Sequence, residues 1–328
     1  MELSKSKKEA IKKIFNVLNL GELNEIAPIE SSQNIVYKVD TINKSYILKE
    51  YSKDAIKNEY DLRKRKRQIS VSEKFSENGV PTILPLKFNS KYFICYKKTY
   101  YLVYDYCDYE ILEPKNLDNK KIKKLANTLA IMHKLNIKSE LPCQYKQIKI
   151  DFNKYLKKYK RIDNELYKIL YDNYFILEGL TTNCNNNIRY IKNNMCVSHN
   201  DYKLKNILWQ KDFMYLIDFD ACAMVNPSVS LAECAFSLAR KNNKVDKDMY
   251  KEFLKVYLKK YGALPNTYKD ALVVAVNGKL QWLEYLMSKC SKNNPKAIED
   301  TINMIKELVL YANNIDELNS IYLSVVKN

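Results

Sequence analysis

The stretch VSHNDYKLKNILWQKDFMYLIDFD, residues 197–220, sets polar side chains at regular intervals around two short apolar runs. The runs NILWQ and MYLIDF flank the turn-like pair KD, which predicts a short β-hairpin. One of the chain's two histidines, His199, precedes the hairpin and is followed by Asp201 and Asn206, while Asp218 stands at the end of the second run. The stretch therefore collects potential oxygen ligands and proton acceptors beside one hairpin.

The residues that precede this stretch divide into a sheet-forming part and a helical part. IVYKV and YILKEY alternate apolar and polar residues around the turn residues DTINKS, which predicts a hairpin after an amphipathic first helix. A helix is expected from about residue 54 to 78, stopped by Gly79 and Pro81, and TILPLKFNSKYFICYKKTYYLVYDYCD supplies further strands with NSK as a turn. The first hundred residues therefore predict a small sheet with one helix packed on it.

From residue 118 onward the apolar residues follow helical spacing. Ile122, Leu125, Leu129 and Met132 fall on one helix face, and residues 151–180 and the C-terminal stretch continue the pattern. We therefore expect an α+β fold with two lobes. Residues 1–104 would form an N-terminal antiparallel-sheet lobe with one helix. Residues 105–328 would form a larger, mainly helical lobe.

Composition limits the class of protein. An apolar fraction of 46% and an aromatic fraction of 12% over 328 residues are too high for a disordered chain. The net charge of +17 suggests nucleic acid as a partner. However, the lysines are scattered, and the run at residues 63–67 is expected on a helix, where its charges would project around the axis. A solvated basic surface is therefore expected, and nucleic-acid binding is the third-ranked hypothesis.

The cysteines and the hydropathy pattern indicate a compartment. Eight cysteines stand singly, without CxxC pairs, which argues against a zinc site and against a disulfide framework. No stretch reaches the roughly 18 uninterrupted apolar residues of a membrane span, and the first residues have no cleavage-site pattern. A location in the reducing cytoplasm, with no membrane partner, is expected.

The spacing in residues 197–220 matches the chemistry of phosphoryl transfer. Asp201 would accept a hydrogen bond from the attacking hydroxyl, and Asn206 and Asp218 would offer oxygen ligands to Mg²⁺. The reaction also needs a cation for the nucleotide phosphates, and Lys49 in the strand YILKEY can supply it. A strand lysine alone is usually a solvated residue, but the joint occurrence in this order favours a kinase.

These residues resemble the aminoglycoside phosphotransferase and choline kinase superfamily, including its bacterial spore-coat kinase-like branch, over nearly the whole chain. In that family the loop is typically H-G-D-x-x-x-x-N, and here Asn200 stands in the glycine position. The stretches that carry the resemblance are SSQNIVYKV, YILK, ENGVPTILPL, YYLVYDYC, LANTLAIMHKLN, VSHNDYKLKNIL and YLIDFDACAMVNPSVSLAECAF.

The resemblance implies a protein-kinase-like fold that holds ATP or GTP between its lobes. Residues 1–104 would be the nucleotide-binding lobe, and residues 105–328 would carry the catalytic loop and the acceptor site. The resemblance also places the purine-binding hinge at Asp105 to Cys107, with His199 bracing the catalytic loop and Asp220 as a second metal ligand or a structural acceptor. The nucleotide loop would be Ser31, Ser32, Gln33 and Asn34. Because none of the five glycines lies in that loop, its backbone cannot wrap phosphates as a glycine-rich loop does, and modest nucleotide affinity is expected.

Two positions depart from the family pattern. The family pairs its strand lysine with a helix glutamate, but the spacing here points to Gln68, which leaves Glu59 and Glu73 as alternatives. Where the family often has Asp before Leu-Ala, this chain has Ser230. The glutamate partner of Lys49 therefore stays open.

The first hypothesis is a Mg²⁺-dependent kinase that transfers the γ-phosphate of ATP or GTP to a hydroxyl of an aminoglycoside, choline-like or sugar-like acceptor. A cationic acceptor needs acidic or aromatic groups, for which Trp282 and Tyr285 and four carboxylates are available: Asp108, Glu110, Asp151 and Glu284. The alternative is a kinase-like structural or binding protein with little turnover, such as a spore-coat component. The oligomeric state does not follow from the sequence.

Overall fold

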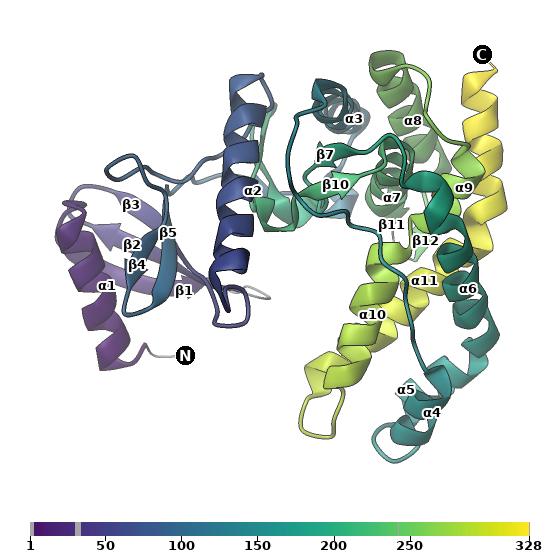
Figure 1. The fold of residues 1–328 in the computed structure, drawn as a ribbon, viewed down its shortest axis with the longest axis horizontal. Helices are drawn as coiled ribbons and strands as arrows, with labels where there is room; N and C mark the ends of the chain where they lie inside the picture. Colours follow the sequence, from purple (N-terminus) through teal and green to yellow (C-terminus); the bar gives the residue numbers. More distant parts are fainter. Residues whose placement is uncertain (1–2, 30–33, 242, 328) are drawn as a thin grey trace. The chain divides into compact units, whose positions relative to one another are not determined.

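The structure, a computed structural model, describes residues 3–29, 34–241 and 243–327 (Figure 1). The chain divides into two compact units. The first comprises the residues up to Glu110 together with Leu208–Asp220, and the second comprises Ile111–Ile207 and the residues from Ala221 onward. The expected functional boundary between residues 104 and 105 stays a prediction, whereas the structural units change at Glu110 and around the returning segment Leu208–Asp220.

The first unit contains a five-stranded antiparallel sheet in the order β1-β2-β3-β5-β4. Its register places Lys49 of β3 between Val36 of β2 and Leu102 of β5. The strands are β1 (Leu23–Ile29), β2 (Ile35–Thr41), β3 (Ser45–Glu50), β4 (Ile94–Tyr96) and β5 (Thr99–Asp105).

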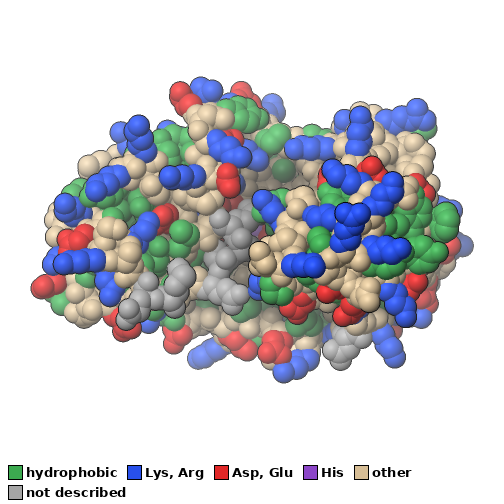
Figure 2. Space-filling view, turned by 90° about the horizontal axis from the view of Figure 1, so that it is seen from below, with side chains coloured by type: hydrophobic (Ala, Val, Ile, Leu, Met, Phe, Trp, Pro, Cys, Tyr) green, Lys and Arg blue, Asp and Glu red, His purple; other side chains and the backbone are tan. Residues whose placement is uncertain are grey.

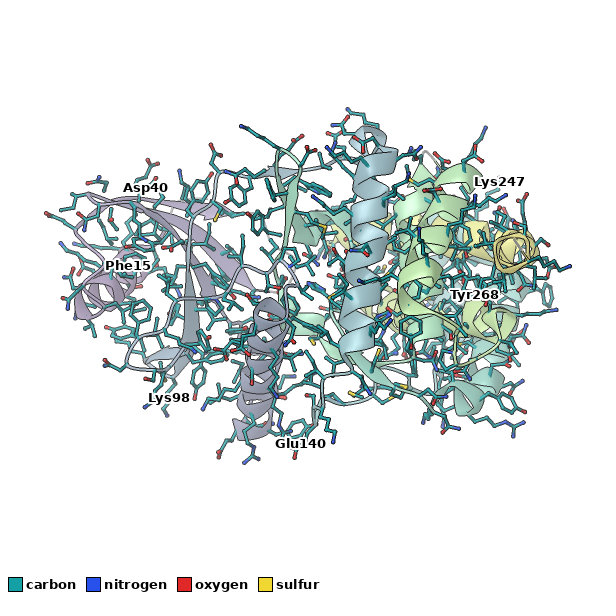
Figure 3. All side chains as sticks on the ribbon, turned by 90° about the horizontal axis from the view of Figure 1, so that it is seen from above. Phe15, Asp40, Lys98, Glu140, Lys247 and Tyr268 are labelled. Atoms are coloured by element: carbon teal, nitrogen blue, oxygen red, sulfur yellow. The ribbon has the colours of Figure 1, made fainter. Side chains whose placement is uncertain are left out.

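Helix α1 (Lys5–Val17) covers part of this sheet because its apolar residues repeat at helical spacing. Ile11, Ile14 and Phe15 are buried and join alternate strand residues in one core. Phe15 is labelled in Figure 3. Its ring meets the ring of Tyr46 edge to face at a centroid distance of 5.7 Å. The helix starts at Ser4, whose side chain accepts a hydrogen bond from the backbone N–H of Lys7.

Helix α2 (Glu59–Glu77) begins after Asn58, whose side chain accepts from the Asp61 N–H at 3.0 Å, and ends before Gly79, where φ is +81°. The returning segment carries most of β8 (Ile207–Gln210) and all of β9 (Phe213–Leu216). The backbone of Leu216 donates to Pro81 O at 2.8 Å and accepts from Ile83 N–H at 3.0 Å. These bonds attach the hairpin to the first unit.

The second unit is mainly helical. The predicted face of α3 is fully buried, with Ile122, Leu125, Leu129 and Met132 each 0% exposed. The helices are α3 (Asn119–Leu135), α4 (Phe152–Tyr159), α5 (Asn164–Asp172), α6 (Tyr174–Ile191), α7 (Pro227–Ala239), α8 (Lys247–Tyr261), α9 (Tyr268–Val274), α10 (Asn277–Lys289) and α11 (Pro295–Val326).

Short strands complete the architecture. β7 (Cys196–Ser198) pairs antiparallel with β10 (Ala223–Val225), and these strands flank residues 199–222 in the chain. β11 (Arg240–Lys241) pairs with β12 (Lys244–Val245), and β6 (Glu110–Ile111) belongs to the small sheet of β8 and β9. The result confirms an α+β fold with an N-terminal antiparallel sheet and a helical C-terminal part.

The surface and the thiols add two findings. Lys and Arg side chains are spread over the face in Figure 2, with acidic and uncharged side chains among them, so no large area of that face is purely basic. All eight cysteines are free thiols. Across the described ranges, no helix has both the length and the apolar composition needed to cross a bilayer.

Candidate active-site residues

Lys49 is the centre of a charged group in the first unit. The lysine is 7% exposed, and its Nζ lies 2.7 Å from Asp218 Oδ1 and 2.8 Å from Asp220 Oδ2. Burial alone would lower the pKa of Lys49, but the two carboxylates raise it above its usual value. Lys49 therefore stays charged. Its two anionic partners, Asp218 and Asp220, lie 169 and 171 residues later in the sequence.

Asp218 follows β9 in an unusual backbone conformation. Its φ of +60° lies in the left-handed region, which few residues other than glycine adopt. The conformation turns the chain sharply between β9 and Asp220, and it leaves the Asp218 side chain 44% exposed while Asp220 is 19% exposed. Asp218 is therefore the more accessible of the two carboxylates.

The Asp220 carboxylate accepts hydrogen bonds from two further side chains, while its predicted role as a metal ligand or a structural acceptor stays open. Its Oδ1 accepts from the Tyr51 hydroxyl at 2.8 Å, and its Oδ2 accepts from Asn34 Nδ2 at 2.9 Å in addition to Lys49. The backbone carbonyl of Asp220 accepts from Arg65 Nη1 and from Gln68 Nε2, both at 2.7 Å. Burial would raise the pKa of Asp220, but the charges of Lys49 and Arg65 lower it.

The structure shows which acidic side chains pair with Lys49. Within the described residues, the ion pairs of Lys49 are those to the two aspartates. Gln68 contacts the Asp220 backbone instead, while Glu59 lies 3.6 Å from Arg63 and Glu73 pairs with Lys87 at 2.5 Å. Neither glutamate is an ion-pair partner of Lys49.

The remaining predicted nucleotide contacts are only partly visible. Ser31, Ser32 and Gln33 lie outside the described residues. Asp105 ends β5, and its carboxylate accepts from Lys44 Nζ at 2.6 Å. Cys107 Sγ lies 3.8 Å from the Asp105 carbonyl. Their roles as a purine-binding hinge stay predictions.

A second polar group belongs to the second unit and contains the predicted catalytic loop. Asn206, in a short 3₁₀ turn (Leu204–Asn206), donates from Nδ2 to Asp201 Oδ2 at 2.8 Å and to Asp201 O at 2.9 Å. His199 is 0% exposed, and its Nδ1 accepts from the Asp201 backbone N–H at 3.3 Å. His199, Asp201 and Asn206 are therefore brought together, with His199 contacting the backbone of the loop.

Two lysines flank Asp201. Lys203 Nζ lies 3.0 Å from Asp201 Oδ1, and Lys205 Nζ lies 3.3 Å from Oδ2. Burial would raise the pKa of Asp201, but these two cations and the Asn206 hydrogen bond bring it down to about 2. The carboxylate is therefore ionised at neutral pH.

Asn200 shows why the loop accepts asparagine in the glycine position. Its φ is +61°, in the left-handed region where glycine is favoured and asparagine is the best tolerated alternative. The Asn200 side chain donates from Nδ2 to the carbonyl of Ala221 at 3.0 Å and to the side-chain oxygen of Gln144. Asparagine therefore keeps the turn and adds two hydrogen bonds that glycine cannot make.

The other histidine, His133, is a core residue. It is 2% exposed, with its ring nitrogens 2.7 Å from the Tyr257 hydroxyl and 3.0 Å from the Ser198 hydroxyl. Burial lowers the pKa of His133 to about 3. The ring is therefore neutral, and it connects α3 to β7 just before the catalytic loop.

Among the described residues of the second unit, two of the hollows bear on the site. The smaller one lies at the predicted catalytic loop and has room for roughly one water molecule. Its lining residues are Asn200, Asp201, Tyr202, Lys203, Ser230, Glu233, Cys234 and Ser237. The larger one, of about 390 Å³, is lined by Arg240, Asn243, Trp282, Leu286, Asp300, Asn303, Met304, Lys306 and Glu307. The acceptor carboxylates expected from the sequence line neither hollow, whereas Trp282 lines the larger one.

Sequence reasoning missed Arg65, Lys203, Lys205 and Glu233. Arg65 was included in a run of surface charges, yet it stands three and four residues before the buried Gln68 and Ile69, and this spacing places it on the inner face of α2. The two lysines lie two and four residues after Asp201, within the motif itself. Glu233 had no local signal, because the hollow that it lines is formed by distant segments.

Comparisons with solved structures identify the fold. A spectinomycin phosphotransferase in complex with ADP and spectinomycin aligns with a TM-score of 0.69 and 14% identity, covering 94% of this chain and 98% of that one. An amicoumacin kinase in complex with AMP-PNP, Ca²⁺ and Ami aligns with a TM-score of 0.60 and 13% identity over 93% and 96%. The choline kinase LicA from Streptococcus pneumoniae aligns with a TM-score of 0.60 and 17% identity over 92% and 99%. The fold is therefore that of the protein-kinase-like phosphotransferases.

The sequence profile of the phosphotransferase enzyme family matches residues 25–269. The match covers most of the chain, including the β-sheet of the first unit and the catalytic-loop region of the second. The chain belongs to this family. A search of curated proteins finds no match.

Proposed function

We propose that the protein is a Mg²⁺-dependent small-molecule kinase that transfers the γ-phosphate of ATP or GTP to an alcohol hydroxyl. The observation that carries this proposal is the arrangement of Asp201, held by Asn206 and Lys203 at the edge of a hollow. An ionised carboxylate fixed at a hollow can accept a hydrogen bond from a hydroxyl bound there. The ligands named for two solved structures, ADP with spectinomycin and AMP-PNP with Ami, support a nucleotide and a small acceptor as partners.

The main role of Asp201 would be to position the acceptor hydroxyl. It would take the proton of that hydroxyl only late in the reaction. A carboxylate with a pKa of about 2 is a weak base, and phosphoryl transfer has a loose transition state that needs little nucleophile activation. In the step, the bond from the acceptor oxygen to the γ-phosphorus forms while the bond from that phosphorus to the β–γ bridging oxygen breaks. The hydroxyl proton passes to the Asp201 carboxylate, and the nucleoside diphosphate leaves. Lys203, beside Asp201, would stabilise charge on the transferred phosphoryl group.

The groups available for nucleotide and metal fit this chemistry. Within the described residues, no cluster of three or more His, Cys, Asp and Glu is arranged to hold a metal ion. A kinase Mg²⁺ needs only one or two protein oxygens, because phosphates and water supply the remaining ligands. Asp218, with its accessible carboxylate, and Asn206 would hold the ion, which neutralises phosphate charge when bound, and Lys49 would bind phosphate oxygens. Asp220 would hold Lys49 and Asn34 in place.

The rival proposal is a kinase-like binding protein with little turnover, such as a spore-coat component. It is favoured by the absence of glycine from residues 31–34 and by the absence of a glutamate partner for Lys49 among the described residues. It is disfavoured by the ordered contacts among His199, Asp201 and Asn206, which a protein without turnover does not need. For either proposal, the eight free thiols favour a reducing compartment such as the cytoplasm.

Asp201→Asn separates the two proposals. The variant keeps the side-chain shape and loses its charge, so nucleotide and Mg²⁺ affinity should stay within about threefold, whereas acceptor-dependent turnover should fall by at least about 10²-fold. Calorimetric nucleotide titration beside nucleotide consumption with a panel of sugars, amino alcohols and aminoglycosides measures both quantities. Asp172→Asn, at an exposed position on α5, is the control and should change neither.

Two outcomes would go against the kinase. A wild-type protein that binds Mg²⁺-nucleotide but shows no acceptor-dependent consumption across the panel supports the binding protein. A variant at Asp201 that phosphorylates an identified acceptor as fast as the wild type removes the assigned role of this residue.

A further inference from the structure

Building on the proposed function, we infer that Glu233 is a specificity-determining residue that binds a second hydroxyl of a neutral polyhydroxylated acceptor, close to the hydroxyl that is phosphorylated. The inference starts from the small hollow at the catalytic loop, which Glu233 lines together with Asp201. Glu233 lies on α7, three residues after Ser230, so both side chains face the hollow from one side of the helix.

Glu233 differs from the other acidic side chains around it. Asp201 is held by Lys203, Lys205 and Asn206, whereas in the described part of the chain the Glu233 carboxylate has no hydrogen-bond or ion-pair partner. A half-buried carboxylate without a donor is costly, because its lost hydration is not replaced. A ligand in the hollow that donates a hydrogen bond would provide the missing partner.

The charges around Glu233 identify the kind of donor. Lys279 Nζ lies 3.0 Å from Glu307, which also pairs with Arg240 at 3.2 Å. Five cations thus stand against four carboxylates around the two hollows, namely Lys203, Lys205, Lys279, Arg240 and Lys306 against Asp201, Glu233, Asp300 and Glu307. Because the region is not negative overall, it offers little electrostatic attraction to a cationic acceptor. A neutral hydroxyl can still donate a charge-assisted hydrogen bond to the carboxylate.

The sizes of the two hollows agree with a polyol. The small hollow has room for roughly one water molecule, so it admits the one hydroxyl that Glu233 would bind, while the hydroxyl to be phosphorylated stays at its edge beside Asp201. Lys279 contacts the linings of both hollows, since its Nζ lies 3.4 Å from Ser237 Oγ of the small one and 3.0 Å from Glu307 of the large one. The larger hollow, of about 390 Å³, offers the indole of Trp282 and the amide of Asn303. An aromatic face with amides suits a sugar-like ring whose hydroxyl reaches Glu233.

The test compares acceptors that share a carbon skeleton and differ in charge. Glucose is paired with glucosamine, and glycerol with serinol. Binding is measured by ligand-observed NMR with Mg²⁺ and a non-hydrolysable nucleotide analogue present, and turnover is measured separately by nucleotide consumption. At least one neutral member should bind about tenfold more tightly than its amine counterpart. Glu233→Gln should raise the dissociation constant and KM for that polyol about tenfold, with kcat within about threefold.

Matched variants keep the result interpretable. Glu299→Gln, at an exposed position on α11, should leave binding and KM unchanged. Glu233→Asp keeps the charge one methylene further back, so it should weaken polyol binding less than Glu233→Gln does. If the glutamine variant fails to fold, Glu233→Asp still tests the inference. A Glu233→Asp protein that binds the polyol as tightly as the wild type overturns the inference.

The outcomes for the inference and for the proposed function differ. Tighter binding of the amines, equal behaviour of Glu233→Gln and Glu299→Gln, or no binding by any member of the panel each overturns the inference. Polyol binding that depends on Glu233 without turnover supports the inference and contradicts the kinase. Turnover with an unchanged KM in Glu233→Gln supports the kinase and overturns the inference.

Discussion

Lys49 is a buried charge whose position is determined by two carboxylates far away in the sequence. Taking an ammonium group out of water is costly unless anions and hydrogen bonds replace the water. Asp218 and Asp220 replace it at 2.7 and 2.8 Å. In the proposed kinase, the phosphates of a nucleotide would take the place of one of these carboxylates beside Lys49.

Lys49→Ala should therefore weaken nucleotide binding at least tenfold. It should also lower the free energy of unfolding by about 3 kcal/mol, because it leaves two carboxylates together without their cation. Calorimetric titration with Mg²⁺-nucleotide and urea unfolding measure the two effects. Lys53→Ala, at an exposed position after β3, is the control. Lys44 is less suitable as a control, because its substitution would break the ion pair with Asp105. Equal nucleotide affinity in the two variants would show that Lys49 does not bind phosphate.

Single residues also show how far the sequence predicts the site. The spacing of His199, Asp201 and Asn206 predicts that they lie together, because a short loop of eight residues has little conformational freedom. The pairing of Lys49 with Asp218 was not predictable from local pattern, since it depends on how β3 and the segment after β9 meet in the fold. The left-handed φ of Asn200 and Asp218 could be suspected only at Asn200, where the family has glycine.

At the scale of elements, α2 fixes the segment that carries both aspartates. Arg65 and Gln68, one turn apart on the inner face of the helix, both donate to the Asp220 carbonyl, and Arg65 Nη1 also donates to Gln68 Oε1 at 3.1 Å. Phe75 on the same helix packs against Phe219 at a centroid distance of 6.1 Å. The helix therefore positions the backbone around Phe219 and Asp220 in two ways. Arg65 and Gln68 form hydrogen bonds with it, and Phe75 packs against it further along the helix.

Arg65→Ala should lower the free energy of unfolding by about 2 kcal/mol, because it removes a charged donor from a buried carbonyl and from the region of Asp220. Arg63→Ala, on the outer face of the same helix, should change it by less than about 0.5 kcal/mol, since Arg63 is exposed and lies 3.6 Å from an exposed Glu59. Urea unfolding of both variants gives the comparison. Equal losses would show that the inner contacts contribute no more than a surface pair.

The elements themselves differ in how well periodicity predicts them. The buried face of α3 is the one that its sequence predicts, because one uninterrupted apolar repeat extends over the length of the helix. The helical pattern at residues 151–180 continued without a visible stop, yet the structure breaks it into three helices. Asp163 caps α5 by accepting from the Leu166 N–H at 2.8 Å, and α6 starts after Asn173. A capping side chain such as Asp163 starts a new helix without changing the apolar period.

At the scale of the whole molecule, the excess of Lys and Arg is a property of the surface more than of a site. The 55 basic residues against 38 acidic ones give +17, but many basic side chains are already paired in ion pairs or spread among acidic neighbours (Figure 2). Such a surface attracts polyanions without selecting among them. The Asp201 carboxylate is, by contrast, held by local contacts with Lys203, Lys205 and Asn206, so the basic surface and the proposed site should respond differently to salt.

Binding of random-sequence duplex DNA tests this distinction. Scattered lysines release counterions from DNA without contacting the bases, so binding should show no sequence preference. The dissociation constant should be larger than about 1 µM at 150 mM salt and should decrease steeply as the salt concentration is lowered. Lys49→Ala should bind DNA within about twofold of the wild type, because Lys49 is buried and paired with carboxylates. Fluorescence anisotropy over a salt series measures the slope, and Mg²⁺-nucleotide titration at the same salts supplies the comparison. Submicromolar, salt-resistant binding to particular sequences would instead make nucleic acid a specific partner of this surface.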